Sequence, residues 1–275
     1  MTTARREQLL SYAVLGAFAI VAIYPILSIV LLAFHRRSDL VTGFDIPDRL
    51  SFDTFKQAWE LGGFGRGLLN SFIVAASVSV ATAVLSTLAG YAFGAMRFRG
   101  SEPLFYLLLI GLIFPYEATV IPLYYVFKDA GLTDSYWALI LPQIGLSIPF
   151  GTFWMRAFFR STPISLVEAS RLDGASSLAT LLRVLLPQAK PALTTLVVLV
   201  FMWTWNEFLL ALVMIQSDDL RTAPLGLALF AGANRTQDPT LTAAAAVLVA
   251  LPVVIVYVFL QRSSIRGMFA GGVKE

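Results

Sequence analysis

The sequence predicts an all-α protein that crosses a membrane several times. Of its 275 residues, 57% are hydrophobic and only 13% are charged, which is far from the usage of a soluble domain. The apolar residues are gathered in runs as long as the roughly 20 residues that a helix needs to cross a bilayer. Polar segments with glycine or proline separate these runs. We therefore expect a polytopic membrane protein with six transmembrane helices.

We interpret the whole chain, 1–275, as one transmembrane domain. The first apolar run is too long for a cleaved signal peptide, so we expect it to remain as a membrane span. A short surface helix is predicted over Thr54–Glu60, and Pro115 and Pro122 interrupt the third run. Lys128 to Ser135 forms a brief polar turn. The predicted spans cover about 9–34, 68–95, 104–127, 136–155, 191–215 and 241–260, with a longer polar segment at 216–240.

A polar loop at 156–190 separates the fourth and fifth spans, and its pattern predicts two short helices hinged at Gly174. Thr162 and Pro163 favour a helix start, although a capping box between Ser165 and Glu168 would begin it slightly later. Glycine tolerates the left-handed conformation that ends helices. Ser176 or Ser177 can cap the second helix, whose apolar stripe is Leu178, Leu181, Leu182, Leu185 and Leu186. Pro191 is predicted to begin the fifth span.

The distribution of basic residues predicts the orientation. With the N-terminus inside, 12 of the 20 Lys and Arg residues fall in inner segments, and the short loops carry most of this bias. Both termini and the loop at 156–190 are then cytoplasmic, and the chain is a multi-pass protein of the cytoplasmic membrane in contact with membrane lipid. We expect no nucleic-acid partner.

Catalysis by this chain is disfavoured. The sequence has no Cys and a single His, His35, so neither a cysteine nucleophile nor a His-rich metal site is available. None of the four lysines follows a glycine, which excludes the Gly-Lys-Ser/Thr phosphate loop. We expect no catalytic residue, no metal and no cofactor bound by this chain.

Two acids inside apolar runs, Glu117 and Glu207, are candidates for a solute path, because charges at membrane depth are costly unless they line water or find partners. On a helix, Trp203 shares a face with Asn206 and Glu207. An indole beside an amide and a carboxylate suits a sugar or polyol. Alternatively, the tryptophans form an interfacial belt, while the polar pair joins helices during assembly.

The middle of the loop contains Glu168-Ala169-Ser170-Arg171-Leu172-Asp173-Gly174-Ala175, and Leu186-Pro187 follows twelve residues beyond Gly174. This pattern closely resembles the E-A-A signature of permease subunits of bacterial ABC importers, in the maltose-type branch for carbohydrate uptake. It has Ser170 where alanine is usual, and the chain ends Val273-Lys274-Glu275 rather than in glycine. Further stretches agree along most of the chain: Asn70-Ser71-Phe72-Ile73-Val74-Ala75, Ile121-Pro122-Leu123, Gly131-Leu132-Thr133-Asp134-Ser135-Tyr136, Trp205-Asn206-Glu207-Phe208 and Gly271-Gly272-Val273-Lys274.

The resemblance implies the transmembrane-domain fold of a type I ABC importer. It also implies three kinds of protein partner: a homologous sister permease, a dimer of ATPase subunits that hold ATP and Mg, and an extracytoplasmic solute-binding protein. The loop would contain the coupling helix, and the residues that resemble the ATPase-coupling motif are Glu168, Ala169, Ser170, Leu172, Asp173, Gly174, Ala175 and Pro187. ATP hydrolysis on the partners would then drive alternating access for a sugar or oligosaccharide.

Two alternatives remain at this point. A phosphorylated polyol of the glycerol-phosphate type would be carried by the same class of importer, although the apolar runs offer no cation for its phosphate. An ion-coupled secondary transporter would use Glu117 and Glu207 for proton or sodium coupling. That second class gives the loop at 156–190 no role.

Overall fold

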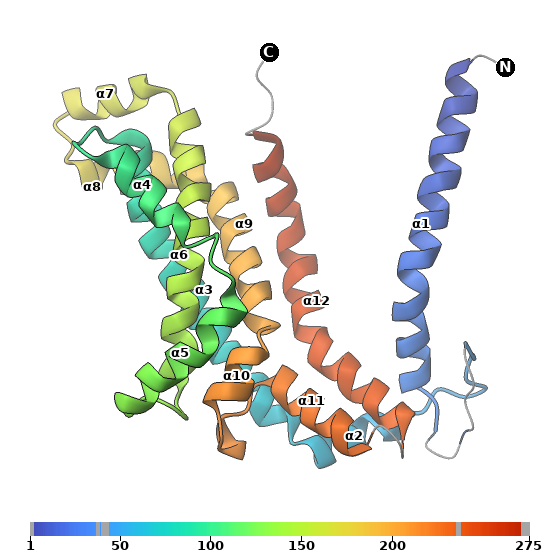
Figure 1. Cartoon of the computed structure of the whole chain (residues 1–275). Helices are drawn as coiled ribbons and strands as arrows, with labels where there is room; N and C mark the ends of the chain where they lie inside the picture. Colours follow the sequence, from blue (N-terminus) through green and yellow to red (C-terminus); the bar gives the residue numbers. More distant parts are fainter. Residues whose placement is uncertain (1–2, 37–38, 40–43, 235–237, 271–275) are drawn as a thin grey trace. The chain divides into compact units, whose positions relative to one another are not determined.

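The computed structural model describes residues 3–36, 39, 44–234 and 238–270, and α-helices dominate these residues, which contain no β-strand (Figure 1). The helical prediction is thereby confirmed. The chain divides into two compact units, one formed by Met1–Gly65 and Gly226–Leu251 and the other by Arg66–Leu225 and Pro252–Glu275. Both α11 (Ala223–Asn234) and α12 (Pro239–Ala270) contribute to the two units.

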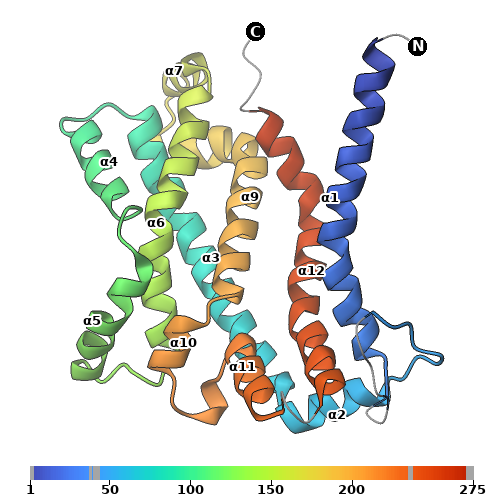
Figure 2. The ribbon, with the colours of Figure 1, turned by 45° about the vertical axis from the view of Figure 1, so that its right-hand side comes forward.

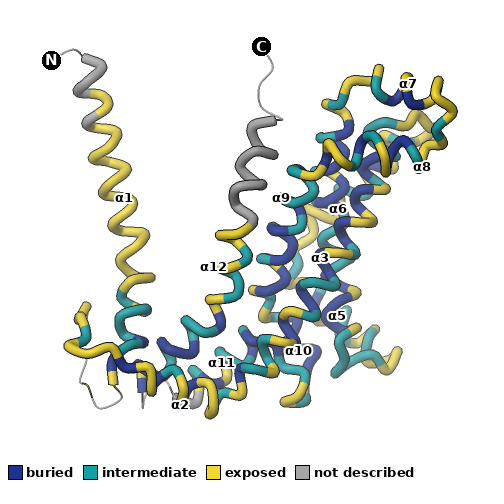
Figure 3. Tube along the Cα trace, turned by 180° about the vertical axis from the view of Figure 1, so that it is seen from behind, coloured by how far each residue is buried: buried dark blue, intermediate teal, exposed yellow. Residues whose placement is uncertain are grey.

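The first unit contains α1 (Thr3–Ala33) and α2 (Asp53–Gly62). None of the residues in the apolar window of α1 is buried, and Figure 3 shows this helix exposed along most of its length. The Thr54 hydroxyl donates to the His35 carbonyl over 2.7 Å, which joins α2 to the end of the first apolar run. The short surface helix predicted over Thr54–Glu60 is therefore present within α2.

The second unit is built around α3 (Phe64–Ala95), α6 (Tyr136–Ser161) and α9 (Leu186–Trp205). Helices α6 and α9 lie side by side, as Figure 2 shows, and the Trp154 indole donates to the Ala192 carbonyl over 2.9 Å. The core of this unit combines a large apolar cluster with buried hydroxyl and amide side chains. Its largest fully buried side chains include Leu139, Met155, Leu181, Leu185, Leu196, Leu210 and Met214.

Glycines allow α3 and α6 to approach closely. A Cβ atom at Gly90 would lie 2.5 Å from the Met155 Cβ, and one at Gly94 would lie 2.9 Å from the Phe159 Cβ. Real Cβ atoms do not come so near, so only glycine fits at these positions without movement of the partner helix. Small residues at such an interface are typical of helices packed in membranes.

The third apolar run is not one helix. It folds as α4 (Ser101–Ile110) and α5 (Tyr116–Asp129), separated by residues 111–115. The predicted interruption at Pro115 is confirmed, since the proline immediately precedes α5, whereas Pro122 lies inside α5 without ending it. Among the described residues, five helices rather than six are long and apolar enough to cross a membrane.

The fifth run also differs from its prediction. Pro191 does not begin a helix but lies inside α9. The short α8 (Ser177–Ala179), the π-helical turn η1 (Thr180–Leu185) and α9 form one continuous helix over Ser177–Trp205. The second loop helix is therefore not separate from the membrane span. Pro187 lies in the first turn of α9, where proline is favoured, whereas Pro191 lies one turn further on, where its nitrogen can donate no hydrogen bond to the Pro187 carbonyl.

The same run ends early, because α9 stops at Trp205 and residues 206–208 lead into the short α10 (Leu209–Met214). The segment at 216–240 is less polar than predicted. It contains the 3-10 turn η2 (Asp218–Leu220) and the apolar helix α11. The sixth span is confirmed within α12, whose apolar part runs over Pro239–Phe259.

Candidate functional site

The loop after α6 presents α7 (Ile164–Leu172), which ends in a Schellman motif. Gly174 has a φ of +79°, in the left-handed region that glycine tolerates best. The Ala175 amide donates to the Ser170 carbonyl over 2.9 Å, and the Gly174 amide donates to the Arg171 carbonyl over 3.0 Å. These two bonds satisfy carbonyl groups that the helix end would otherwise leave open. The predicted helix stop at Gly174 is confirmed.

The start of α7 differs from both predicted forms. Pro163 occupies the N-cap position without a side-chain hydrogen bond, and the first helical residue is Ile164. The Thr162 hydroxyl donates instead to the Phe158 carbonyl at the end of α6. Ser176 does cap the next helix, since its hydroxyl accepts from the Ala179 amide over 3.3 Å. Thr162 therefore caps the C-terminal end of α6 and does not cap the start of α7.

The outer face of α7 and the turn that follows are open to contact. Glu168, Ala169, Asp173 and Gly174 are all exposed. Leu172 is 89% exposed, the largest value among the exposed large hydrophobic side chains of the described residues. An apolar side chain held out by a rigid helix end is a suitable anchor for a partner's groove. Five of the eight predicted coupling residues thus share one exposed tip.

The other three predicted coupling residues differ in their surroundings. Ser170 is buried, and its hydroxyl donates to the Val167 carbonyl and lies 2.9 Å from the hydroxyl of the fully buried Thr180. Ser170 therefore joins α7 to η1 rather than facing outward. Ala175 is half-buried beside it, and Pro187 is exposed in the first turn of α9. The tip is supported from behind by a polar contact that the sequence pattern did not predict.

A second candidate region lies where α9 breaks. Glu207 accepts hydrogen bonds from the amides of Leu210 and Ala211, over 2.8 and 3.2 Å, and from the Tyr116 hydroxyl. The carboxylate thus caps α10 and joins it to the first turn of α5. Asn206 is exposed, with its side-chain amide donating to the Met202 carbonyl over 2.7 Å. Glu207 is therefore tolerated inside an apolar run because its carboxylate has hydrogen-bond partners within the chain.

Trp203 lines a cavity of about 380 Å³ beside this break. Its wall is contributed by the turn after α4, the start of α5, the middle of α6 and the end of α9. The lining residues are Gly111, Leu112, Phe114, Tyr116, Gln143, Leu146, Ser147, Trp203 and Thr204. Glu117, Asn206 and Glu207 are not among them, and Glu117 is exposed on α5 next to Tyr116. The structure therefore brings Trp203 to the cavity and leaves the other three predicted path residues at its margin.

The polar members of this wall were missed from the sequence, Tyr116 and Gln143 among them. Tyr116 contacts Glu207 across 91 positions, which no local pattern could indicate. Gln143 is buried inside α6, where its amide donates to the Leu139 carbonyl. A buried amide in an apolar helix was a signal that could have been used, since such groups need partners. In the described part of the chain, no group of three His, Cys, Asp or Glu side chains is placed to hold a metal ion.

Comparisons with known proteins indicate the family of the chain. Residues 83–269 match the family model described as "binding-protein-dependent transport system inner membrane component". The trehalose transport system permease protein SugB of Mycobacterium tuberculosis is 32% identical over 92% of this chain and 93% of its own length. The maltodextrin transport system permease protein MdxG of Bacillus subtilis is 31% identical over 99% of both chains.

A solved structure supports the same fold. The crystal structure of a bacterial ABC transporter involved in the import of the acidic polysaccharide alginate contains a chain that is 26% identical to this one. The match covers 95% of this chain and 98% of that chain with a TM-score of 0.79. Because the family model spans more than half of the sequence and these relatives match nearly its whole length, the chain belongs to the family of inner membrane components of binding-protein-dependent transport systems.

Proposed function

We propose that this chain is the permease subunit of an ABC importer that moves a sugar or oligosaccharide across the cytoplasmic membrane. The observation that carries the proposal is the exposed tip formed by α7 and Gly174, with Leu172 at its end. An exposed helix end of this kind suits contact with an ATPase subunit. The names of the relatives, which transport trehalose and maltodextrin, support a carbohydrate as the cargo.

In this proposal, partner proteins supply the other parts of the importer. A homologous sister permease completes the translocation path, and an extracytoplasmic binding protein delivers the solute. Two cytoplasmic ATPase subunits bind ATP and Mg and receive the tip of α7 in a groove. Closure and reopening of the ATPase pair would then move the helices between inward-facing and outward-facing states, while this chain performs no catalysis. In this arrangement the α7 tip, both termini and the α3–α4 turn lie on the cytoplasmic side, as the basic residues predict.

The cavity beside the break in α9 is the proposed solute contact of this subunit. Trp203 is 51% exposed and meets the Phe150 ring edge-to-face, with 4.9 Å between the ring centroids. An indole held in this way offers a flat surface to the C–H face of a sugar ring. Gln143 and Ser147 lie in the same wall and can bond sugar hydroxyls. Non-helical backbone at membrane depth is tolerated where it lines such a cavity.

The first experiment tests the tip. In vesicles containing the complete importer, Gly174→Asp should abolish ATP-dependent uptake while ATP hydrolysis by the partner subunits continues, because the new carboxylate adds negative charge at the contact. Replacement of Glu168 should uncouple in the same way. Gly174→Asn is the matched control, since asparagine tolerates the left-handed conformation. Normal uptake by Gly174→Asp would contradict the proposal.

The second experiment tests the cargo. Trp203→Ala should lower sugar uptake by at least ten-fold, roughly the 1.4 kcal/mol equivalent of losing an aromatic contact. Trp137→Ala, which alters an exposed tryptophan at the start of α6 outside the cavity, should leave uptake unchanged. Uptake should also cease without the binding protein or without ATP. Equal effects of the two tryptophan variants would remove Trp203 from the solute path.

A further inference from the structure

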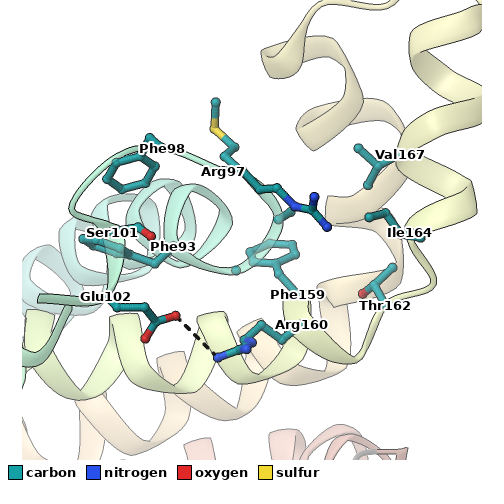
Figure 4. A pocket seen from close by; sticks show the side chains of 13 residues that line it. Phe93, Arg97, Phe98, Ser101, Glu102, Phe159, Arg160, Thr162, Ile164 and Val167 are labelled. Atoms are coloured by element: carbon teal, nitrogen blue, oxygen red, sulfur yellow. Dashed lines mark ion pairs between the residues drawn. The ribbon is translucent and has the colours of Figure 1, made fainter. Parts of the chain in front are cut away.

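A second cavity of the Arg66–Leu225 unit lies beside α7 and shares no lining residue with the proposed solute contact (Figure 4). Its volume is about 400 Å³. The wall is formed by the ends of α3 and α6, the turn between α3 and α4, and the start of α7. The residues that matter for its chemistry are Phe93, Arg97, Glu102, Phe159, Arg160 and Val167.

The single acid of this wall is already neutralised. Glu102 accepts a hydrogen bond of 2.6 Å from Arg156, which is 8% exposed and does not line the cavity. The same guanidinium donates to the Phe93 carbonyl over 3.2 Å and lies over the Phe105 ring, 3.7 Å from its centroid. Arg156 is thus held by a carboxylate, a carbonyl and a ring. The negative charge of Glu102 is balanced by this buried guanidinium.

Two exposed cations remain at the cavity. Arg160 comes within 3.8 Å of Glu102, which is ion-pair range but too long for a hydrogen bond. Arg97 forms no ion pair with any carboxylate of the described residues. Figure 4 shows its side chain extending from the α3–α4 turn toward Ile164 and Val167 of α7. The cavity therefore has an excess of positive charge, in guanidinium groups whose forked geometry suits phosphate oxygens.

The surroundings of the cavity are apolar in one direction. Phe93 and Phe159 contribute to its wall. Starting at its rim, α4 exposes Leu104, Leu107 and Ile110, which are 50%, 63% and 46% exposed at every third position. Free phosphate would use only the two arginines. A phosphate that carries acyl chains would use both the arginines and this strip of α4, since basic pockets at the ends of membrane helices suit anionic head groups.

From this geometry we propose that the cavity binds the head-group phosphate of an anionic phospholipid, with its acyl chains along the exposed face of α4. Arg97 and Arg160 bind the phosphate, and Arg156 balances the negative charge of Glu102 in the cavity wall. Because Val167 of α7 forms part of the wall, a bound lipid also contacts the helix that carries the exposed tip. The inference goes beyond the proposed function and is tested by binding alone, so failure of either leaves the other standing.

The test uses the intact complex that co-purifies with this chain, stripped of lipid and then supplied with phosphatidylglycerol or phosphatidylcholine. Native mass spectrometry counts the lipid that stays bound. We expect tight retention of phosphatidylglycerol and little of phosphatidylcholine. Arg97→Gln and Arg160→Gln should each weaken phosphatidylglycerol binding by about five-fold, the effect of one arginine at an anionic surface. Arg97→Lys should restore part of the binding.

Arg99→Gln is the matched control, because Arg99 belongs to the same turn and is exposed but does not line the cavity. It should bind lipid as the unchanged complex does. Equal retention of both lipids, or an equal loss with Arg99→Gln and Arg97→Gln, would overturn the proposal. Inorganic phosphate is added at millimolar concentration in a third arm. If it displaces phosphatidylglycerol and binds alone with the same dependence on Arg97, the site takes free phosphate and the lipid assignment is wrong.

Discussion

Helices of this protein are held together in two different ways. Where α3 meets α6, close contact depends on the absence of side chains at Gly90, Gly94 and Gly151, with a hydrogen bond from Arg156 to the Phe93 carbonyl beside it. Elsewhere helices end early, and a polar group at each end joins the neighbouring element, as Glu207 joins α10 to α5 and Ser170 joins α7 to η1. We call these second contacts polar joints.

The difference separates a rigid support from elements that can be rearranged. Close packing of two long helices offers no intermediate position, because any shift either overlaps atoms or opens a void. A polar joint has few bonds, and each can be exchanged for water or another donor. The proposed solute cavity and the exposed tip both lie beside polar joints. The α3–α6 contact is therefore the closely packed part of the unit, and α7 and α10 are joined to their neighbours through few polar bonds.

The largest expected effect is at the close contact. Gly90→Ala should destabilise the protein by about 2 kcal/mol, because overpacking outweighs the gain in helix propensity. Gly145→Ala is the control, since Gly145 also lies in a helix but has no atom within 4 Å of an added Cβ. Thermal unfolding in detergent measures both. Equal stability of the two variants would show that α3 and α6 are not closely packed.

The polar joint at Glu207 should show the next largest loss of stability. Glu207→Ala leaves two amides of α10 and the Tyr116 hydroxyl without their acceptor, at a cost of about 2 kcal/mol at most. Tyr116→Phe removes only one bond and should cost about 1 kcal/mol. Unfolding of the two single variants and of the double variant gives the coupling energy between them. Additive losses would mean that Glu207 and Tyr116 act independently and that no joint exists.

A smaller effect is expected inside the loop. Ser170→Ala leaves the Thr180 hydroxyl without a partner and should cost about 1 kcal/mol. Adding Thr180→Val should recover part of the loss, since both polar groups are then gone. Ser165→Ala, at an exposed position of the same helix, is the control and should be neutral. If Ser165→Ala costs as much, the hydroxyl pair does not support the tip.

The smallest effect concerns the joint between the α5–α6 turn and the segment after α10. Asp134 accepts from the amides of Ser217 and Gln216 and from the Ser217 hydroxyl, and these bonds hold the pKa of its carboxyl below the usual value. A lowered pKa in the folded state contributes stability that is fully present above the unfolded value near 4 and is lost as pH falls through the folded value.

The unfolding temperature of the native chain should accordingly fall more steeply below about pH 4 than that of Asp134→Asn, because only the native carboxylate can lose its charge there. Asparagine is a suitable replacement, since Asp134 has a φ of +55° and asparagine tolerates this conformation. Identical pH profiles would show that the carboxylate adds nothing beyond the loop's own backbone.

Local signals in the sequence were sufficient wherever structure depends on neighbours along the chain. Gly174 predicted a helix stop because a left-handed turn needs glycine, and Pro115 predicted the break in the third run. They failed at Pro191, which lies inside α9 rather than at the start of a helix. The apolar composition of α11 was missed because short polar flanks on both sides dominated the pattern.

The sequence by itself determined that this is a helical membrane protein with an exposed polar loop, and its motifs indicated the transporter family, because hydrophobic runs and turn residues act locally. Only the tertiary structure decided which polar groups are paired with partners inside the chain. It placed Glu207 on Tyr116, Ser170 on Thr180 and Arg156 on Glu102, and so left Trp203, Leu172 and Arg97 available to ligands. The physical reason is that a hydrogen bond between distant segments leaves no periodic mark in the sequence.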